Sequence, residues 1–269
     1  MASATTDLPP QVDPETETDP DEKSVLGHLA SFAKELFFVV VGAIIVASLL
    51  RMFVGQMFLI PSPSMESTLM TGDRVVAQKI TDFNRGDVVV FEDPGGWLRN
   101  QQNTERGPAG KALQFIGVLP DLSKGDLVKR VVGMPGDRVV CCDGTGKITV
   151  NGQPLDETSY IMRDASGKQL NPSDVTFDVV VPKDKLFVLG DNRKESADSR
   201  CHLSDVWLSE KKGAVAFVPI DMVVGPAFAV VAPFNHAKRL KAPEIFSTVP
   251  VAAQPAPEEA VIKPAGVTC

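Results

Sequence analysis

One long apolar run near the N-terminus constrains the architecture of this chain more than any other feature. Residues 36–50 carry no charged side chain, and the run continues past Arg51 to Val54. As a helix it would span about 28 Å, which matches the hydrocarbon thickness of a bilayer, and the Arg51 side chain can reach the interface. We therefore predict one transmembrane helix over residues 33–55.

Two other interpretations of this run are weaker. A buried helix of a globular domain is disfavoured by the length of this run together with its apolarity on every face. A cleavable signal peptide begins with a short basic region, whereas a long and mostly acidic stretch comes first here. Lys23 and Lys34 on one flank, against Arg51 on the other, favour a cytoplasmic N-terminus under the positive-inside rule.

Composition separates a main domain from two tails. The chain has 269 residues, of which 43% are apolar, so a sizeable core is possible beside the membrane segment. Residues 1–24 are acidic and rich in Pro and Thr, and residues 242–269 are rich in Ala, Pro and Val. We predict that both are disordered tails, which leaves residues 56–241 as the folded domain.

The folded domain reads as mainly β. Its short runs of Val, Ile, Leu and Phe are separated by Gly, Pro and Asn, which is typical of strands joined by turns. Asn151-Gly152 predicts a tight hairpin. The predicted strands cover residues 73–77, 87–91, 127–132, 138–141, 148–150, 185–189 and 223–231.

Charge and cysteine content exclude several classes of function. The net charge is -7 without a basic cluster, which argues against a nucleic-acid partner. The four cysteines lack CxxC spacing and the three histidines are scattered, so we predict no metal and no cofactor. If the domain is exported, we expect Cys201 to form a disulfide with Cys141 or Cys142.

A serine and a lysine carry the chemistry that the sequence suggests. Ser64 lies in a Pro-rich turn just beyond the apolar run, and a serine nucleophile needs a base. A lysine can be that base if burial lowers its pKa. Strand alternation puts Lys129 on the same face as Leu127 and Val131, while Arg130 faces the other way and cannot lose its proton. Taken singly, such a serine and such a lysine are usually structural.

Together these clusters resemble the bacterial type I signal peptidases, which are membrane-anchored serine proteases with a Ser/Lys pair. The resemblance implies an antiparallel β-sheet or barrel-like catalytic domain, of the fold shared with self-cleaving repressors, preceded by one transmembrane helix. It covers, in the family's order, residues 58–68, 72–73, 85–89, 129–137 and 190–200.

Position by position, the resemblance implies Ser64 as nucleophile and Lys129 as general base. The Ser64 N–H and the Ser62 hydroxyl would form the oxyanion hole, and Ser196 would orient the Lys129 amine. Pro63 stands where glycine is often found, and it should stiffen the turn. A further group of residues would support the site through charge-assisted hydrogen bonds: Arg130, Asp191, Arg193, Asp198 and Arg200.

The resemblance also implies a function. It predicts an endopeptidase at the outer face of the cytoplasmic membrane that removes signal peptides from exported preproteins through an acyl-enzyme. The preproteins, the lipid bilayer and the export translocon would be its partners. Two alternatives stay open: a related Ser/Lys peptidase that cleaves itself, which the acidic N-terminus and apolar run disfavour, and a membrane-tethered β-rich binding module, which the presence of Ser64, Lys129 and Ser196 together disfavours.

Overall fold

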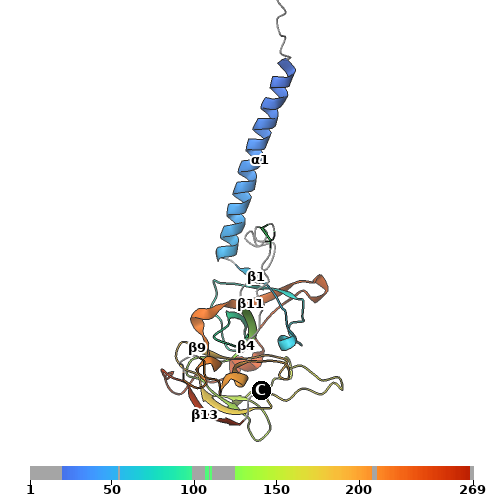
Figure 1. The fold of residues 1–269 in the computed structure, drawn as a ribbon. Coiled ribbons are helices and arrows are strands. Elements are labelled where there is room, and N and C mark those ends of the chain that lie inside the picture. Colours follow the sequence, from blue (N-terminus) through green and yellow to red (C-terminus); the bar gives the residue numbers. More distant parts are fainter. Residues whose placement is uncertain are drawn as a thin grey trace, which may run out of the picture. The chain divides into compact units, whose positions relative to one another are not determined.

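The computed structural model describes residues 20–53, 55–98, 107–108, 110, 125–207 and 211–266. Its contacts divide the chain into two units, residues 1–46 and 47–269. The first contains most of helix α1, and the second contains all the described strands. We describe the helix and the β part separately (Figure 1).

Helix α1 runs from Pro20 to Phe53. Within it, Gly27–Ala47 form a segment of 21 residues with mean hydropathy 2.1 and no buried side chain. Among the described residues this is the one helix long and apolar enough to cross a bilayer by length and composition. It begins six residues before the predicted span 33–55, and the side chains of residues 48–54 lie outside the described part. The helix also begins inside the predicted tail 1–24, of which residues 1–19 are not described.

The larger sheet contains eight strands. Its order is β1-β2-β11-β3-β4-β9-β10, and β12 pairs with β11. The strands are β1 (Gln56–Leu59), β2 (Arg74–Ala77), β3 (Val88–Glu92), β4 (Asp126–Gly133), β9 (Lys185–Leu189), β10 (Val218–Pro219), β11 (Val223–Ala232) and β12 (Lys238–Arg239).

The smaller sheet has five strands in the order β13-β8-β5-β6-β7. Figure 1 places β1 and β11 at one end of the β part and β13 at the other, with β4 and β9 between them. Every strand pair in the described residues is antiparallel, which confirms the predicted mainly β, antiparallel class. Its strands are β5 (Arg138–Cys141), β6 (Thr149–Val150), β7 (Gln153–Pro154), β8 (Thr176–Val180) and β13 (Val261–Gly266).

Short 3-10 helices join the strands. Two of them, η1 and η2, begin within segments that the sequence analysis singled out for chemistry. The full set is η1 (Pro63–Met65), η2 (Ser199–His202), η3 (Ala214–Ala216), η4 (Ile220–Met222), η5 (Phe234–His236) and η6 (Glu244–Thr248).

The sequence predicted most strands because their apolar residues are dense. All seven predicted strands are present within a residue or two of their expected bounds. The hairpin at Asn151-Gly152 is also confirmed: Val150 pairs with Gln153, and both turn residues have positive φ, 52° and 82°, as a type I′ turn requires. The analysis missed the short or polar strands β1, β7, β8, β10, β12 and β13.

The predicted disorder of residues 242–269 is wrong for residues 242–266. Strand β13 pairs with β8, and η6 places Phe246 and Val249 in the core with 4% and 7% exposure. The Phe246 ring lies 5.9 Å from that of Tyr160. A composition rich in Ala and Pro concealed these apolar anchors, since a few well-placed large side chains are enough to hold a segment. Residues 267–269 lie outside the described part.

The predicted pairing of Cys201 with Cys141 or Cys142 is also wrong. Cys141 and Cys142 are bonded to each other, so neither is available to Cys201. The compartment argument favours disulfides in general, but it cannot select a partner. The observed bond joins adjacent residues, the last residue of β5 and the one after it.

Replacement of Phe246 tests whether this C-terminal segment belongs to the fold. Phe246→Ala should lower the free energy of unfolding by about 3 to 5 kcal/mol, because it removes a buried ring and leaves a cavity. Phe234→Ala is the matched control, since Phe234 is 91% exposed. Thermal unfolding followed by fluorescence of the buried Trp97 measures both variants. Equal stability of the two variants would contradict the observed packing.

Candidate active site

Ser64 lies in the short helix η1, which follows β1. Two backbone hydrogen bonds close the loop around it, from Ile60 N to Asp73 O and from Gly72 N to Ile60 O, both 2.9 Å. Pro63 occupies the first turn of η1, where its fixed φ suits a helix start. Met65, only 1% exposed, packs into the core beneath. The serine is therefore presented from a rigid turn, as Pro63 predicted.

Lys129 reaches Ser64 from strand β4. Its Nζ donates to Ser64 Oγ at 2.8 Å and to the Val128 carbonyl oxygen at 3.1 Å. The strand partner opposite Lys129 in the sheet is the fully buried Val89. Both members of the pair are buried, with Ser64 7% and Lys129 3% exposed. The structure thus brings the two predicted residues into direct contact although 65 positions separate them.

Burial lowers the pKa of Lys129 to about 8 from its ordinary value of 10.5, because the charged ammonium loses its hydration. The Asp198 and Asp191 carboxylates oppose this effect, and Arg200 adds to it. A pKa near 8 leaves a substantial fraction of neutral amine at ordinary working pH. Lys129 can therefore accept a proton from Ser64 Oγ, which lies within hydrogen-bond distance.

Two donors lie beside the serine. The Ser62 hydroxyl donates to Ser64 Oγ at 3.3 Å. Ser64 is the second residue of η1, and the N–H groups of a first turn have no partner within their own helix. Asn192 N–H holds the Ser64 carbonyl oxygen at 3.1 Å, which ties the turn to the loop after β9. Both groups predicted for the oxyanion hole therefore flank the Ser64 hydroxyl.

Ser196 is buried at the same place but does not bond to the lysine. Its Oγ makes no hydrogen bond of good geometry, and it lies near enough to Asp198 to help to lower the pKa of that carboxyl. An added Cβ on Gly190 would lie 2.1 Å from Ser196 Oγ and 2.5 Å from the Ser64 carbonyl oxygen. Only glycine leaves room for the close approach of these two serines.

Buried arginine–carboxylate pairs clamp the loop at Gly190. Gly190 N–H donates to Asp198 at 3.0 Å, and Arg200 donates to both Asp198 oxygens at 2.8 Å. Burial raises the pKa of Asp198, but Arg200 and these hydrogen bonds outweigh it and lower the pKa overall. On the other side, Arg193 Nε donates to the Gly190 carbonyl oxygen at 2.9 Å. The predicted supporting residues Asp198, Arg200 and Arg193 thus hold the backbone N–H and carbonyl groups of Gly190.

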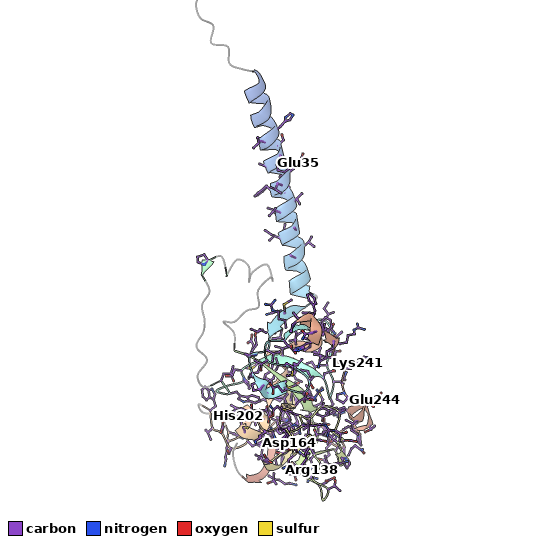
Figure 2. All side chains as sticks on the ribbon, turned by 90° about the vertical axis from the view of Figure 1, so that its right-hand side faces the viewer. Glu35, Arg138, Asp164, His202, Lys241 and Glu244 are labelled. Atoms are coloured by element: carbon purple, nitrogen blue, oxygen red, sulfur yellow. A yellow bond between two sulfur atoms is a disulfide. The ribbon has the colours of Figure 1, made fainter. Side chains whose placement is uncertain are left out.

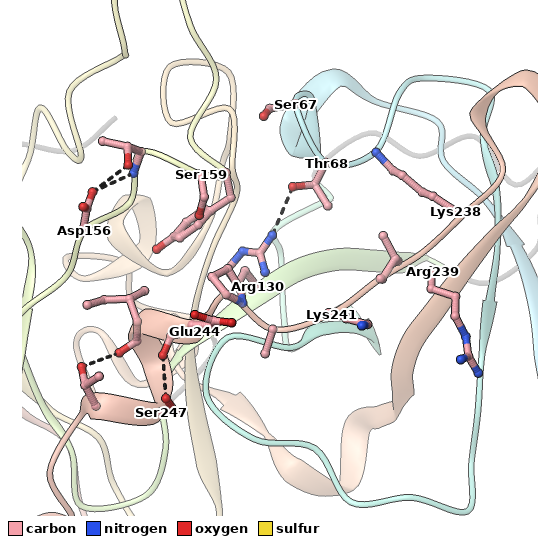
Figure 3. Close-up of a pocket in the computed structure, with 17 residues that line it drawn as sticks. Ser67, Thr68, Arg130, Asp156, Ser159, Lys238, Arg239, Lys241, Glu244 and Ser247 are labelled. Atoms are coloured by element: carbon pink, nitrogen blue, oxygen red, sulfur yellow. Dashed lines mark hydrogen bonds between the residues drawn. The ribbon is translucent and has the colours of Figure 1, made fainter.

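Arg130 and Asp191 form a second buried pair beneath the site. Arg130 donates to the two Asp191 oxygens at 2.8 and 2.5 Å and to the Gly86 carbonyl oxygen at 2.6 Å. Thr68 bonds both partners: its hydroxyl donates to Asp191. The same hydroxyl accepts from Arg130, as Figure 3 shows. The pair therefore connects β4, the turn after Ser64 and the loop after β9, three segments that supply the site.

Sequence reasoning missed Glu157 and Tyr160. Arg193 donates to Glu157 at 2.6 and 3.2 Å, and the Tyr160 hydroxyl donates to Glu157 at 2.6 Å. The Arg130 guanidinium also lies 4.5 Å from the centre of the Tyr160 ring, close enough for a cation–π contact. Neither residue lies in a recognisable motif, so no local signal pointed to them.

The histidines lie elsewhere. His202 stacks on Trp97 and its Nδ1 contacts Asp205 at 2.8 Å, while His236 Nδ1 contacts Asp73 at 2.7 Å. Within the described ranges no group of three His, Cys, Asp or Glu side chains has the arrangement of a metal site.

Comparison with known proteins identifies the family. A sequence model described as "Signal peptidase, peptidase S26" matches residues 33–232. A protein named signal peptidase I from Mycobacterium tuberculosis is 34% identical over 227 residues, which cover 76% of this chain and 74% of the relative. A probable signal peptidase I from Mycobacterium leprae is 34% identical over 252 residues, covering 80% and 79%. A crystal structure of a signal peptidase I from Enterococcus faecalis covers 55% of this chain and 97% of its own, with 25% identity and a TM-score of 0.32.

The chain therefore belongs to the signal peptidase family, peptidase S26. Members of this family are serine proteases that act on preproteins carrying signal peptides. This assigns an enzyme, signal peptidase I, rather than the binding module that the sequence left open. The N-terminal apolar helix fits a membrane-anchored member of the family.

Removal of the buried Asp191 charge tests the contribution of the Arg130–Asp191 pair to stability. Asp191→Asn should destabilise the fold by about 3 to 5 kcal/mol, because it leaves Arg130 charged and unpaired in the interior. Asp178→Asn is the control: its partners Arg138 and Lys263 have side chains 54% and 59% exposed and stay hydrated when the carboxylate is lost, so the loss should be clearly smaller. Urea unfolding measures the difference, and similar losses in the two variants would count against a buried clamp.

Replacement of Lys129 by methionine should stabilise the protein at neutral pH. A lowering of the Lys129 pKa from 10.5 to about 8 corresponds to about 3 kcal/mol. This energy is the destabilisation of the folded protein by the charged Lys129 amine. It is fully present below pH 8, decreases as pH rises from 8 to 10.5, and is absent above that range. The lost hydrogen bond to Ser64 offsets about 1 kcal/mol.

We therefore expect Lys129→Met to unfold at a higher temperature than the unchanged chain at pH 7, with the gain shrinking toward pH 10. Lys168→Met is the control, because Lys168 is exposed and should change little. Thermal unfolding across this pH range measures both. A less stable methionine variant at pH 7 would show that the lysine is not desolvated as its burial indicates.

Proposed function

We propose that this signal peptidase cuts preproteins with Ser64 as nucleophile and Lys129 as general base. The observation that supports this most strongly is the 2.8 Å contact between Lys129 Nζ and Ser64 Oγ inside a buried site. The neutral amine takes the hydroxyl proton as Ser64 Oγ attacks the carbonyl carbon of the scissile bond. The Ser64 N–H and the Ser62 hydroxyl donate to the resulting oxyanion.

The tetrahedral intermediate then collapses to an acyl-enzyme. The Lys129 ammonium gives its proton to the leaving amine, the peptide bond breaks, and the signal peptide stays esterified to Ser64 Oγ. Lys129 next deprotonates a water molecule that attacks the ester, and proton return to Ser64 releases the signal peptide acid. Asp198 and Arg200 hold the Gly190 loop through these steps, and the Arg130–Asp191 pair joins that loop to β4. Ser196, which is buried nearby, is proposed to orient the Lys129 amine.

Helix α1 anchors the enzyme where its substrates lie. The proposed arrangement is a single-pass protein of the cytoplasmic membrane with its β part on the extracytoplasmic side, close to the export translocon. Confining enzyme and signal peptide to one bilayer surface raises their effective concentration. By family resemblance, small side chains at the residue before the cut and two residues further upstream complete the selectivity, since a shallow subsite rejects larger groups.

Loss of either member of the pair should abolish cleavage. Ser64→Ala and Lys129→Ala in the detergent-solubilised full chain should each reduce kcat/KM on a preprotein by at least about 1,000-fold. Ser166→Ala and Lys168→Ala serve as matched controls, since both residues are exposed and lie in a different loop. For the unchanged chain, the rate should rise with pH and level off above about 8, because only neutral Lys129 is a base.

Mass spectrometry of the cleavage products and initial rates from pH 6 to pH 10 provide both measurements. Retention of activity within tenfold by either alanine variant would refute the proposed pair. A rate independent of pH over this range would refute the neutral lysine as base.

A further inference from the structure

A cavity of about 860 Å³ adjoins the turn that carries the nucleophile. Ser67 and Thr68, three and four residues after Ser64, form part of its wall, and Arg130 lies at its base. Residues of β12 and the segment after it, 238–245, line another side. None of the catalytic steps above uses this cavity, although it begins beside the reacting serine.

Three cations gather on the β12 side of the cavity: Lys238, Arg239 and Lys241, all exposed. Figure 3 shows Lys238 extending toward the side that Thr68 lines, whereas Arg239 points away. Figure 2 shows Lys241 at one edge of the β part, near Glu244. In the described ranges neither lysine ammonium group makes a hydrogen bond or ion pair, so their charge is available on a protein whose net charge is -7.

The remaining walls are polar. Asp156 lies opposite the lysines, but its carboxylate already accepts from the Thr158 N–H and hydroxyl at 3.2 and 2.8 Å. Hydroxyl groups line much of the cavity, namely those of Ser67, Thr68, Thr158, Ser159, Ser247 and Thr248. Those of Thr68, Thr158, Ser247 and Thr248 donate within the chain, so Ser67 and Ser159 are the ones that can donate to a peptide backbone. Such a lining suits an extended polar peptide better than an apolar one.

The cavity is within reach of a bound substrate. Three residues of chain span at most about 11 Å, so Ser67 lies within that distance of Ser64. An extended peptide rises about 3.3 Å per residue, so the third to fifth residues after the cut can reach the cavity. On the other side of the cut, the last residues of a signal peptide have small, uncharged side chains. These offer nothing for two lysines to bind.

We infer that this cavity binds the mature part of the preprotein and that Lys238 and Lys241 favour acidic side chains three to five residues after the cut. This inference rests on the proposed function and names a specificity site for it. The Asp156 and Glu244 carboxylates line the same cavity and oppose any anion, whether on a peptide or on a lipid headgroup. The peptide is the better occupant because the wall of the cavity begins three residues after the nucleophile, where the substrate chain must pass.

Three preprotein variants test the site, with Glu, Gln or Lys at the third to fifth residues after the cut. The full chain in zwitterionic detergent should cleave the Glu substrate with a kcat/KM about five- to tenfold above that of the Lys substrate, as expected for exposed charge pairs. The double variant Lys238→Glu/Lys241→Glu should reverse this order. Lys168→Glu, which changes a lysine outside the cavity, should preserve it.

Salt dependence is a second test that needs no protein variant. The ratio of kcat/KM for the Glu substrate to that for the Lys substrate should fall toward one as salt rises from about 0.05 to about 0.5 M. An unchanged ratio in the double variant, or a salt-independent ratio, would overturn the inference. A uniform loss on all three substrates, seen only with phosphatidylglycerol vesicles, would mark a headgroup site and also overturn it. Failure of the proposed function differs from all of these, since it appears as activity retained by Ser64→Ala.

Discussion

The contact between a dehydrated lysine amine and a serine hydroxyl is the interaction on which the rest of this structure depends. Water would keep Lys129 charged and useless as a base, so the fold must bury the amine without giving it a carboxylate partner. Lys129 instead donates to Ser64 Oγ and to one carbonyl oxygen, and Val89 lies opposite it in the sheet. Asp198 and Asp191 still act on it electrostatically, but each is bonded to an arginine of its own.

The arginine–carboxylate pairs explain how two segments far apart in sequence keep this geometry. They neutralise the acids that would otherwise hold Lys129 charged, and their forked hydrogen bonds fix the Gly190 loop against the Ser64 turn. Buried pairs contribute little net stability, so their value here is position. In the proposed mechanism stability and activity therefore oppose one another at Lys129, because the buried amine is costly and the proposed reaction requires it.

Sequence patterns predicted the parts of this molecule that depend on local chemistry. Dense Val runs located the central strands, Asn151-Gly152 located a hairpin, and the motifs around Ser64 and Lys129 anticipated a contact between them. Long-range partners were not predictable: nothing near Glu157 signals that it binds Arg193, and nothing in the Ala- and Pro-rich C-terminus signals that Phe246 fills the core. The bond between Cys141 and Cys142 was not predictable either, since cysteine spacing shows which thiols are near in sequence but not which ones pair.

A direct titration of the Lys129 amine tests this account most sharply. In the full chain with lysine labelled at 13Cε, NMR chemical shifts followed from pH 5 to pH 11 report each amine, and Lys129→Met assigns the resonance. We predict that the Lys129 signal titrates near pH 8, well before the exposed lysines. A Lys129 signal that stays in its protonated form until pH 10 or above would contradict the account, since the amine would then be unable to activate Ser64.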